Sequence, residues 1–253
     1  MTEMKTYELT QYLDDLLRVD EIKDISLNGM QVENSGTVRK VALAVDASLA
    51  SIQAAAEEKA DLLLVHHGLF WDRPLRVTGG HYRRIRALIE NDIALYAAHL
   101  PLDMHPELGN NAQVGPLMGW KPVRPFGDYH GRMLGFEFEP ETPRPLDAFV
   151  RALRKHLHCD PIVWDFGNET VRRIGYVSGG AVDLLDEAVQ KGLDLYITGE
   201  PKHSAYWTAR EARIHVVFAG HYVTEKPGVK AVGRHLEEQS GLETVFLELP
   251  TGH

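Results

Sequence analysis

Histidines and carboxylates follow four of the apolar segments of this 253-residue chain, where such side chains can do chemistry. One segment ends in two adjacent histidines, which a strand of leucine and valine does not need for its own structure. Two others end in a histidine followed four positions later by an acid. Imidazoles and carboxylates gathered in one place serve as metal ligands or as general acids and bases. The residues concerned are His66 and His67 after 61–65, His99 and Asp103 after 93–98, Glu200 after 194–198, and His221 and Glu225 after 216–220.

The size of this set indicates more than one ion. Three or four histidines with two acids exceed the ligands that one tetrahedral ion needs, and a carboxylate can bridge two cations. We therefore expect two divalent metal ions, roughly 3.5 Å apart as in other bridged pairs. Mixed nitrogen and oxygen ligands suit Fe, Mn, Zn, Co or Ni, so the identity of the metal stays open.

Each of these residues also has a simpler explanation when it is taken alone. A single histidine beside a strand is usually a hydrogen-bonded polar residue, and Asp103 or Glu225 could stabilise the N-terminus of a following helix. That role does not explain why both acids follow a histidine by four positions. His203 is compatible with a side chain that lines the site or with one that caps the next helix. Three residues are candidates for catalytic proton transfer: Glu200, His203 and His99.

The remaining polar motifs indicate no competing catalytic site. The glycine-rich segment 177–183 lacks both the Walker lysine and the G-x-G-x-x-G spacing of a nucleotide-binding loop. The single cysteine, Cys159, lies outside the strand-end cluster, which favours a structural role over a nucleophilic one. Seven other histidines lie in polar or helical contexts and are expected to be solvated: His81, His130, His156, His158, His215, His235 and His253.

A repeat organises the elements that position these groups. Residues 38–67 align without a gap on residues 171–200, with five identities in thirty positions and a shared strand–helix–strand pattern. Residues 93–103 match residues 215–225 in the same way. We expect an α/β fold of two pseudo-repeated βαβ halves, with helices flanking a largely parallel sheet and a small intervening subdomain. The expected divisions are 1–118, with an N-terminal helix, 119–170 and 171–253. Ligand sites of such sheets lie beyond the carboxyl ends of the strands.

Composition narrows the class of protein. The chain carries a net charge of −9, 44% hydrophobic residues and one cysteine. It has no apolar run long enough for a membrane span, and its amphipathic start does not resemble a signal peptide. The acidic balance disfavours general nucleic-acid binding, although Arg83, Arg84 and Arg86 form a local basic group. These features favour a cytoplasmic protein.

Five motifs resemble the YbgI-like family of GTP cyclohydrolase I type 2 homologues. They are "LNGMQVE", "VHHGLFW", "HLPLDMHPELGNNAQ", "YITGE" and "AGHYVTEKPGVKAV", and the resemblance covers essentially the whole chain. It implies an α/β protein with a dinuclear metal site, assembled as a toroidal homohexamer. It also implies that the histidine at position 99 lies near the metals. The metal ligands that it implies are His66, His67, Asp103, His221 and Glu225.

Two functions fit these observations. The first is a metal-dependent hydrolase of the cyclohydrolase or amidohydrolase type, which activates water to cleave a C–N bond in a small-molecule substrate. The second is a non-enzymatic metal-binding ring, a scaffold or chaperone that engages a protein or nucleic-acid partner. No base-recognition motif or triphosphate clamp in the sequence selects GTP as the substrate.

Overall fold

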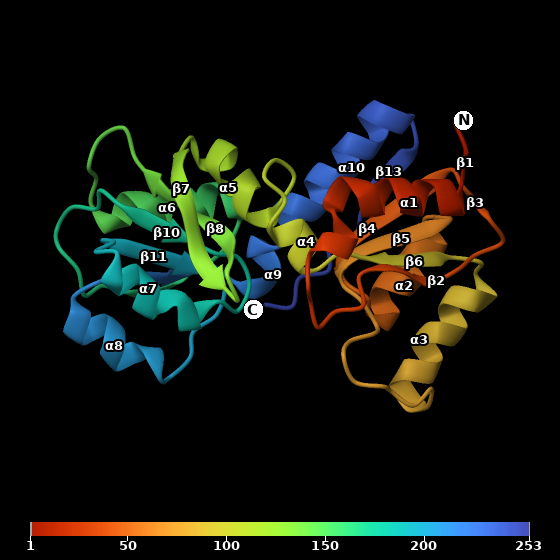
Figure 1. The fold of residues 1–253 in the computed structure, drawn as a ribbon, viewed down its shortest axis with the longest axis horizontal. Helices are drawn as coiled ribbons and strands as arrows, with labels where there is room; N and C mark the ends of the chain where they lie inside the picture. The colour runs from red at the N-terminus through yellow and green to blue at the C-terminus, as the bar shows by residue number, and fades with distance from the viewer. Residues whose placement is uncertain (1, 253) are drawn as a thin grey trace. The chain divides into compact units, whose positions relative to one another are not determined.

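The computed structural model describes residues 2–252 and has a mixed α/β architecture (Figure 1). The chain divides into two compact units, each with its own sheet and flanking helices. Unit 1 comprises residues 1–108 and 229–249, and unit 2 comprises residues 109–228 and 250–253. Within the described residues, no helix combines the length and apolar character that a bilayer span requires.

Unit 1 contains a five-stranded sheet in the order β13-β4-β5-β6-β2. Its first four strands run parallel, and β2 is antiparallel at the edge. A separate two-stranded ladder joins β1 and β3. The strands are β1 (Met4–Lys5), β2 (Gly29–Val32), β3 (Thr37–Val38), β4 (Lys40–Asp46), β5 (Leu62–His67), β6 (Ala94–Ala97) and β13 (Glu243–Phe246).

Helices cover both faces of this sheet, which explains the continuous apolar runs in its strands. Successive residues of β5 alternate between faces: Leu62 and Leu64 belong to the same apolar cluster as α1 and α10, whereas Leu63 and Val65 belong to the cluster of α2 and α3. The helices are α1 (Thr6–Leu17), α2 (Leu49–Glu57), α3 (Gly79–Glu90), α4 (Leu100–Asp103) and α10 (Lys226–Ser240), with a 3-10 turn η1 (Val19–Glu21).

Unit 2 contains a six-stranded sheet in the order β7-β8-β10-β11-β12-β9. Its central strands β10, β11 and β12 run parallel, and β8 and β9 flank them in antiparallel orientation. Residues 119–170, which the sequence predicts to form an intervening subdomain, contribute three strands to this sheet. The domain boundaries after residues 118 and 170 stay a prediction. The strands are β7 (Lys121–Tyr129), β8 (Arg132–Glu139), β9 (Ile162–Trp164), β10 (Ile174–Tyr176), β11 (Leu195–Thr198) and β12 (His215–Phe218).

Local sequence explains the helices of unit 2. In α6, apolar residues recur every three or four positions, from Leu146 through Phe149 and Leu153, and this stripe is buried. Basic residues occupy its last turn, where they interact favourably with the helix dipole, and the residue that caps its C-terminus, His158, has the left-handed conformation. The helices are α5 (Asn110–Met118), α6 (Leu146–Leu157), α7 (Leu185–Gln190), α8 (Ala205–Ala212) and α9 (His221–Thr224), with a 3-10 turn η2 (Val182–Leu184).

The repeat predicted from the sequence is present in the structure. The order β4-α2-β5-α3-β6 in unit 1 corresponds to β10-α7-β11-α8-β12 in unit 2. In both units the last of these strands leads within three residues to a single turn of helix, α4 or α9. The predicted fold class is therefore confirmed.

Truncation of a residue in the middle of β5 tests the two-sided burial of this strand. Leu64 is completely buried, so Leu64→Ala should lower the free energy of unfolding by about 3 kcal/mol through lost apolar burial and the cavity that remains. Urea denaturation followed by circular dichroism measures this change. Ile89→Ala on α3, where the isoleucine is 63% exposed, should change it by less than about 0.5 kcal/mol. Equal effects of the two substitutions would contradict this assignment of burial.

Candidate metal centre

Three histidines of unit 1 meet at the carboxyl ends of β5 and β6, where His66 and His67 are the last residues of β5 and His99 follows β6. These strands are parallel neighbours, with Val65 opposite Ala97, so the residues that follow them emerge at the same edge of the sheet. One ring nitrogen from each of His66, His67 and His99 lies within 4.8 Å of the others. The ring centroids are 4.6 to 5.6 Å apart. This spacing is compatible with a cation held between the rings.

Each of these imidazoles is oriented by a hydrogen bond through the same atom, Nδ1. Carbonyl and ionised carboxylate oxygens only accept hydrogen bonds, so Nδ1 carries a proton, and in the neutral ring Nε2 then presents its lone pair. A histidine that binds a metal typically shows this arrangement, with its other nitrogen donating to an oxygen. The acceptors are Ala98 O for His66 at 2.9 Å, Asp46 Oδ1 for His67 at 2.9 Å and Asp24 Oδ2 for His99 at 3.0 Å.

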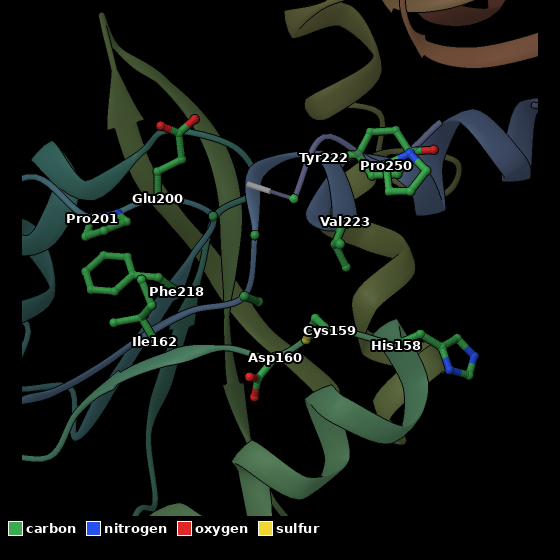
Figure 2. A pocket seen from close by; sticks show the side chains of 14 residues that line it. His158, Cys159, Asp160, Ile162, Glu200, Pro201, Phe218, Tyr222, Val223 and Pro250 are labelled. Carbon is green, nitrogen blue, oxygen red and sulfur yellow. The ribbon is translucent and has the colours of Figure 1, made fainter. Parts of the chain in front are cut away.

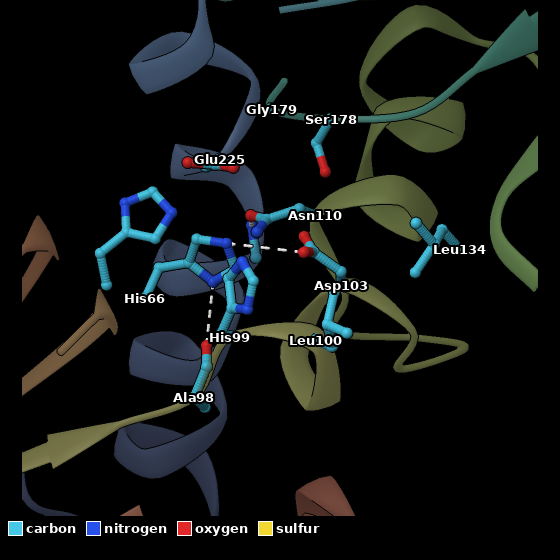
Figure 3. A network of polar contacts seen from close by, with 12 residues as sticks. His66, Ala98, His99, Leu100, Asp103, Asn110, Leu134, Ser178, Gly179 and Glu225 are labelled. Carbon is cyan, nitrogen blue, oxygen red and sulfur yellow. Dashed lines mark hydrogen bonds and ion pairs between the residues drawn. The ribbon is translucent and has the colours of Figure 1, made fainter. Parts of the chain in front are cut away.

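Asp103 adds a carboxylate to this cluster. Its Oδ2 atom lies 3.5 Å from His66 Nε2, and the side chain is buried (Figure 3). The spacing of four residues from His99 is one helical turn, because the Asp103 N–H donates to the His99 carbonyl in α4. The helix that follows, α5, begins after Gly109, so Asp103 is not its N-cap. The alternative prediction, that Asp103 caps the N-terminus of the following helix, is therefore wrong.

The segment before β2 holds His99 in place, a role that the sequence did not predict. Asp24 accepts hydrogen bonds from the Nδ1 of His99, the backbone N–H of Leu100 and the side chain of Asn28. Burial by itself raises the pKa of Asp24, but these hydrogen bonds, that from His99 above all, outweigh it and hold the pKa well below its usual range. Asn28 in turn accepts from the His99 N–H at 2.8 Å. The "LNGMQVE" motif, in which Asn28 lies, is the signal that points to this segment.

Unit 2 carries the second cluster, in the equivalent place. His221 follows β12, and its Nε2 lies 3.0 Å from Oε1 of Glu225, which is buried. Its Nδ1 donates to Glu200, which follows the neighbouring strand β11. Burial by itself lowers the pKa of His221, but the hydrogen bonds and charges of Glu225 and Glu200 outweigh it and raise the pKa to about 9. The two carboxylates thus stabilise positive charge at this position.

Two glycines allow the close packing of this second cluster. A Cβ atom on Gly179 would lie 2.3 Å from Glu225 Oε1, and the residue has a φ of +65°. A Cβ atom on Gly199 would lie 2.8 Å from the Cα of His221. The glycine-rich segment 177–183 therefore serves the approach of Glu225 to the strand end. The Gly179 N–H also donates to Thr224 Oγ1 at 3.0 Å, which fixes α9 against the strand.

The structure also describes His203 and most of the histidines that the sequence predicts to be solvated. His203 is exposed, and the N-cap of α8 is Ser204, so the side chain of His203 is not the cap; its part in catalysis stays a prediction. His81 and His215 are buried, so their expected solvation is wrong. His215 is satisfied because its Nδ1 accepts from the Gly167 N–H and its Nε2 bonds to the Asn168 carbonyl. His253 lies outside the described residues.

Comparison with known proteins agrees with this architecture. The family model described as Duf34/NIF3 (NGG1p interacting factor 3) matches residues 4–252. A protein of Deinococcus radiodurans named GTP cyclohydrolase 1 type 2 homolog is 42% identical over 97% of this chain and 93% of its own length. A protein of Archaeoglobus fulgidus with the same name is 43% identical over 98% of this chain and 99% of its own. The solved structure of protein ybgI, described as of unknown function, superimposes with a TM-score of 0.94 at 36% identity, covering 99% of this chain and all of that one. The resemblance identified from the motifs is thus confirmed.

The carboxylates that orient the histidines should contribute to metal affinity. Asp46→Asn replaces the acceptor of the His67 Nδ1 proton by an amide that can also donate, so the ring loses its fixed tautomer. Zn²⁺ binding should weaken by about 10- to 100-fold in competition with a chromophoric chelator. Asp72→Asn, at an exposed aspartate of the same unit, should leave the affinity unchanged. Equal affinity of the Asp46 variant and the wild type would contradict an orienting role.

Cys159 should behave as an unreactive thiol. Burial raises its pKa to about 11, so only about one thiol in a thousand is ionised at pH 8. Labelling by a disulfide reagent at pH 8 should be far slower than in the urea-unfolded chain, and its rate should rise toward pH 11. Fast labelling of the folded protein at pH 7 would show that Cys159 is an activated nucleophile.

Proposed function

We propose that this chain, which belongs to the Duf34/NIF3 (NGG1p interacting factor 3) family, is a metal-dependent hydrolase with two divalent ions. One observation carries the proposal: three histidines at the strand ends of unit 1 direct Nδ1 to an oxygen and bring one ring nitrogen each within 4.8 Å of the others. His221, the counterpart of His99 in the repeat, also directs Nδ1 to a carboxylate. The proposed ligands are His66, His67, Asp103, His221 and Glu225.

The donor set fits such ions. Imidazole nitrogen and carboxylate oxygen are the ligands of Fe, Mn, Zn, Co and Ni sites, and sulfur is not among them. When bound, two such ions supply Lewis acidity, which activates water and polarises the electrophile of a substrate. That the ligands of both repeats share one pair of ions stays a prediction from the sequence.

Three groups of the chain are proposed to handle protons. Glu200 has a side chain that is 46% exposed, so it can exchange a proton between the site and solvent. His99 is held by Asp24 in one tautomer, which suits either a metal ligand or a proton carrier. His203 is exposed and is the third candidate.

We propose a substrate class on the basis of the names of the relatives. Several relatives carry the name GTP cyclohydrolase 1 type 2 homolog, which denotes hydrolysis of C–N bonds in a purine ring. We propose C–N hydrolysis of a small molecule as the reaction, in the cytoplasm and in a homohexameric assembly. Sedimentation analysis tests the assembly. A ring-shaped scaffold without catalytic activity is the alternative outcome.

Metal content and turnover test this function together. Wild-type protein loaded with Mn²⁺, Fe²⁺ or Zn²⁺ should bind two ions per chain by elemental analysis, and it should hydrolyse at least one member of a panel of purine nucleotides and cyclic amides. His67→Ala and Glu225→Ala should each lose bound metal and reduce kcat by more than about a thousandfold, because Lewis acidity is lost. His130→Ala, at an exposed histidine of unit 2, serves as the matched control. Metal binding without turnover of any substrate would favour the scaffold.

A further inference from the structure

A cavity of about 560 Å³ lies in unit 2 beside the second cluster. Residues beyond β11 and β12 line it together with residues 158–162 and the C-terminal segment (Figure 2). Its volume falls within the range of about 300 to 1,000 Å³ that is typical of small-molecule sites. Glu200 lines this cavity and also accepts the Nδ1 proton of His221. The cavity therefore reaches the carboxylate that orients a proposed metal ligand.

The floor of the cavity is apolar and held firmly. Ile162 is 53% exposed, Phe218 lies beside it, and Val223 also lines the cavity (Figure 2). The Phe218 ring packs edge-to-face on Trp164, with centroids 4.7 Å apart, which fixes its orientation. Such a floor favours a flat or largely apolar ligand over a heavily hydrated one.

Two carboxylates, Glu200 and Asp160, line the cavity together with one imidazole, His158, and no lysine or arginine is among its described lining residues. Asp160 pairs with Arg154 at 3.0 Å, and both of these side chains are exposed. Glu200 gives one oxygen to His221, and the remaining oxygen of this half-exposed side chain can accept from a ligand. A polyphosphate in the cavity would meet a carboxylate without a lining cation to compensate.

We infer that this cavity binds an uncharged or cationic heterocycle whose N–H groups donate hydrogen bonds to Glu200, and that it does not bind phosphate. The base of a purine nucleoside and a cyclic amide both have the required chemistry. This inference rests on the proposed function, because Glu200 connects the cavity to His221. The heterocyclic ring of the substrate would then lie in this cavity, whose described lining offers no lysine or arginine to a triphosphate.

Binding of three probes to the metal-loaded, full-length protein tests the inference. Isothermal titration should give guanosine a Kd within threefold of that of GTP, and hydantoin should compete with guanosine. Inorganic tripolyphosphate should not displace guanosine. If neither guanosine nor hydantoin binds, or if tripolyphosphate displaces guanosine, the inference is overturned.

Two substitutions locate the binding. Ile162→Trp fills the cavity from an exposed position of the edge strand β9, so it should weaken guanosine binding by at least tenfold without loss of metal. Glu200→Gln should weaken it by a similar factor, because the amide oxygen accepts from His221 and the NH2 group then meets the N–H donors of the ligand. Glu211→Gln on α8, an exposed glutamate away from the cavity lining, should change nothing.

The outcomes separate this inference from the proposed function. An Ile162→Trp variant that keeps its metal and its guanosine affinity overturns the cavity assignment and leaves metal-dependent hydrolysis intact. A wild-type protein that binds guanosine in the cavity but holds no metal overturns the proposed function instead. Tighter GTP binding by Glu200→Gln with unchanged guanosine affinity shows that the cavity accepts anions, and it also overturns the inference.

Discussion

The hydrogen bond from Nδ1 to a fixed oxygen is the constraint on which the candidate site depends. An imidazole on a flexible side chain can present either nitrogen to a cation, and an unconstrained ring loses conformational entropy when it binds. Here the partner oxygens are a backbone carbonyl and three carboxylates, all on elements anchored in a buried sheet or beside it. The rings are thus oriented before any ion arrives, which favours affinity and fixes the atom that binds.

The parallel strands of each unit bring the histidines and their hydrogen-bond partners together. In each unit the strands end side by side, so side chains from segments more than twenty residues apart in sequence converge without long loops. In unit 2 the single turn of helix after the last strand brings Glu225 to His221, four residues before it. In unit 1 the equivalent turn brings Asp103 to His66 at the end of the neighbouring strand. The repeat thus preserves the strand, the histidine and the acid, but the acid contacts a different histidine in each unit.

Carboxylates contact histidines in both clusters, and two more line the neighbouring cavity or orient a ring beside it. Carboxylates orient His67, His99 and His221, and they favour a cation over an anion at each position. In the second cluster this preference is visible as the raised pKa of His221. Glu200 lines the cavity and accepts the Nδ1 proton of His221, so a group that bonds to this carboxylate from the cavity is a hydrogen-bond donor and not a phosphate oxygen.

The sequence by itself determined the fold class, the repeat and most of the residues at the strand ends. These follow from periodicity, since apolar runs with helical segments between them indicate a covered parallel sheet, and from residue type, since imidazoles and carboxylates at strand ends are candidate metal ligands. Only the tertiary structure decided the partners of those histidines. Asp24 and Asp46 lie 75 and 21 positions from His99 and His67, and no local pattern marks an aspartate as the acceptor for a distant ring. The burial of His215 escaped prediction for the same reason, because its hydrogen bonds come from a loop 47 and 48 residues earlier in the chain.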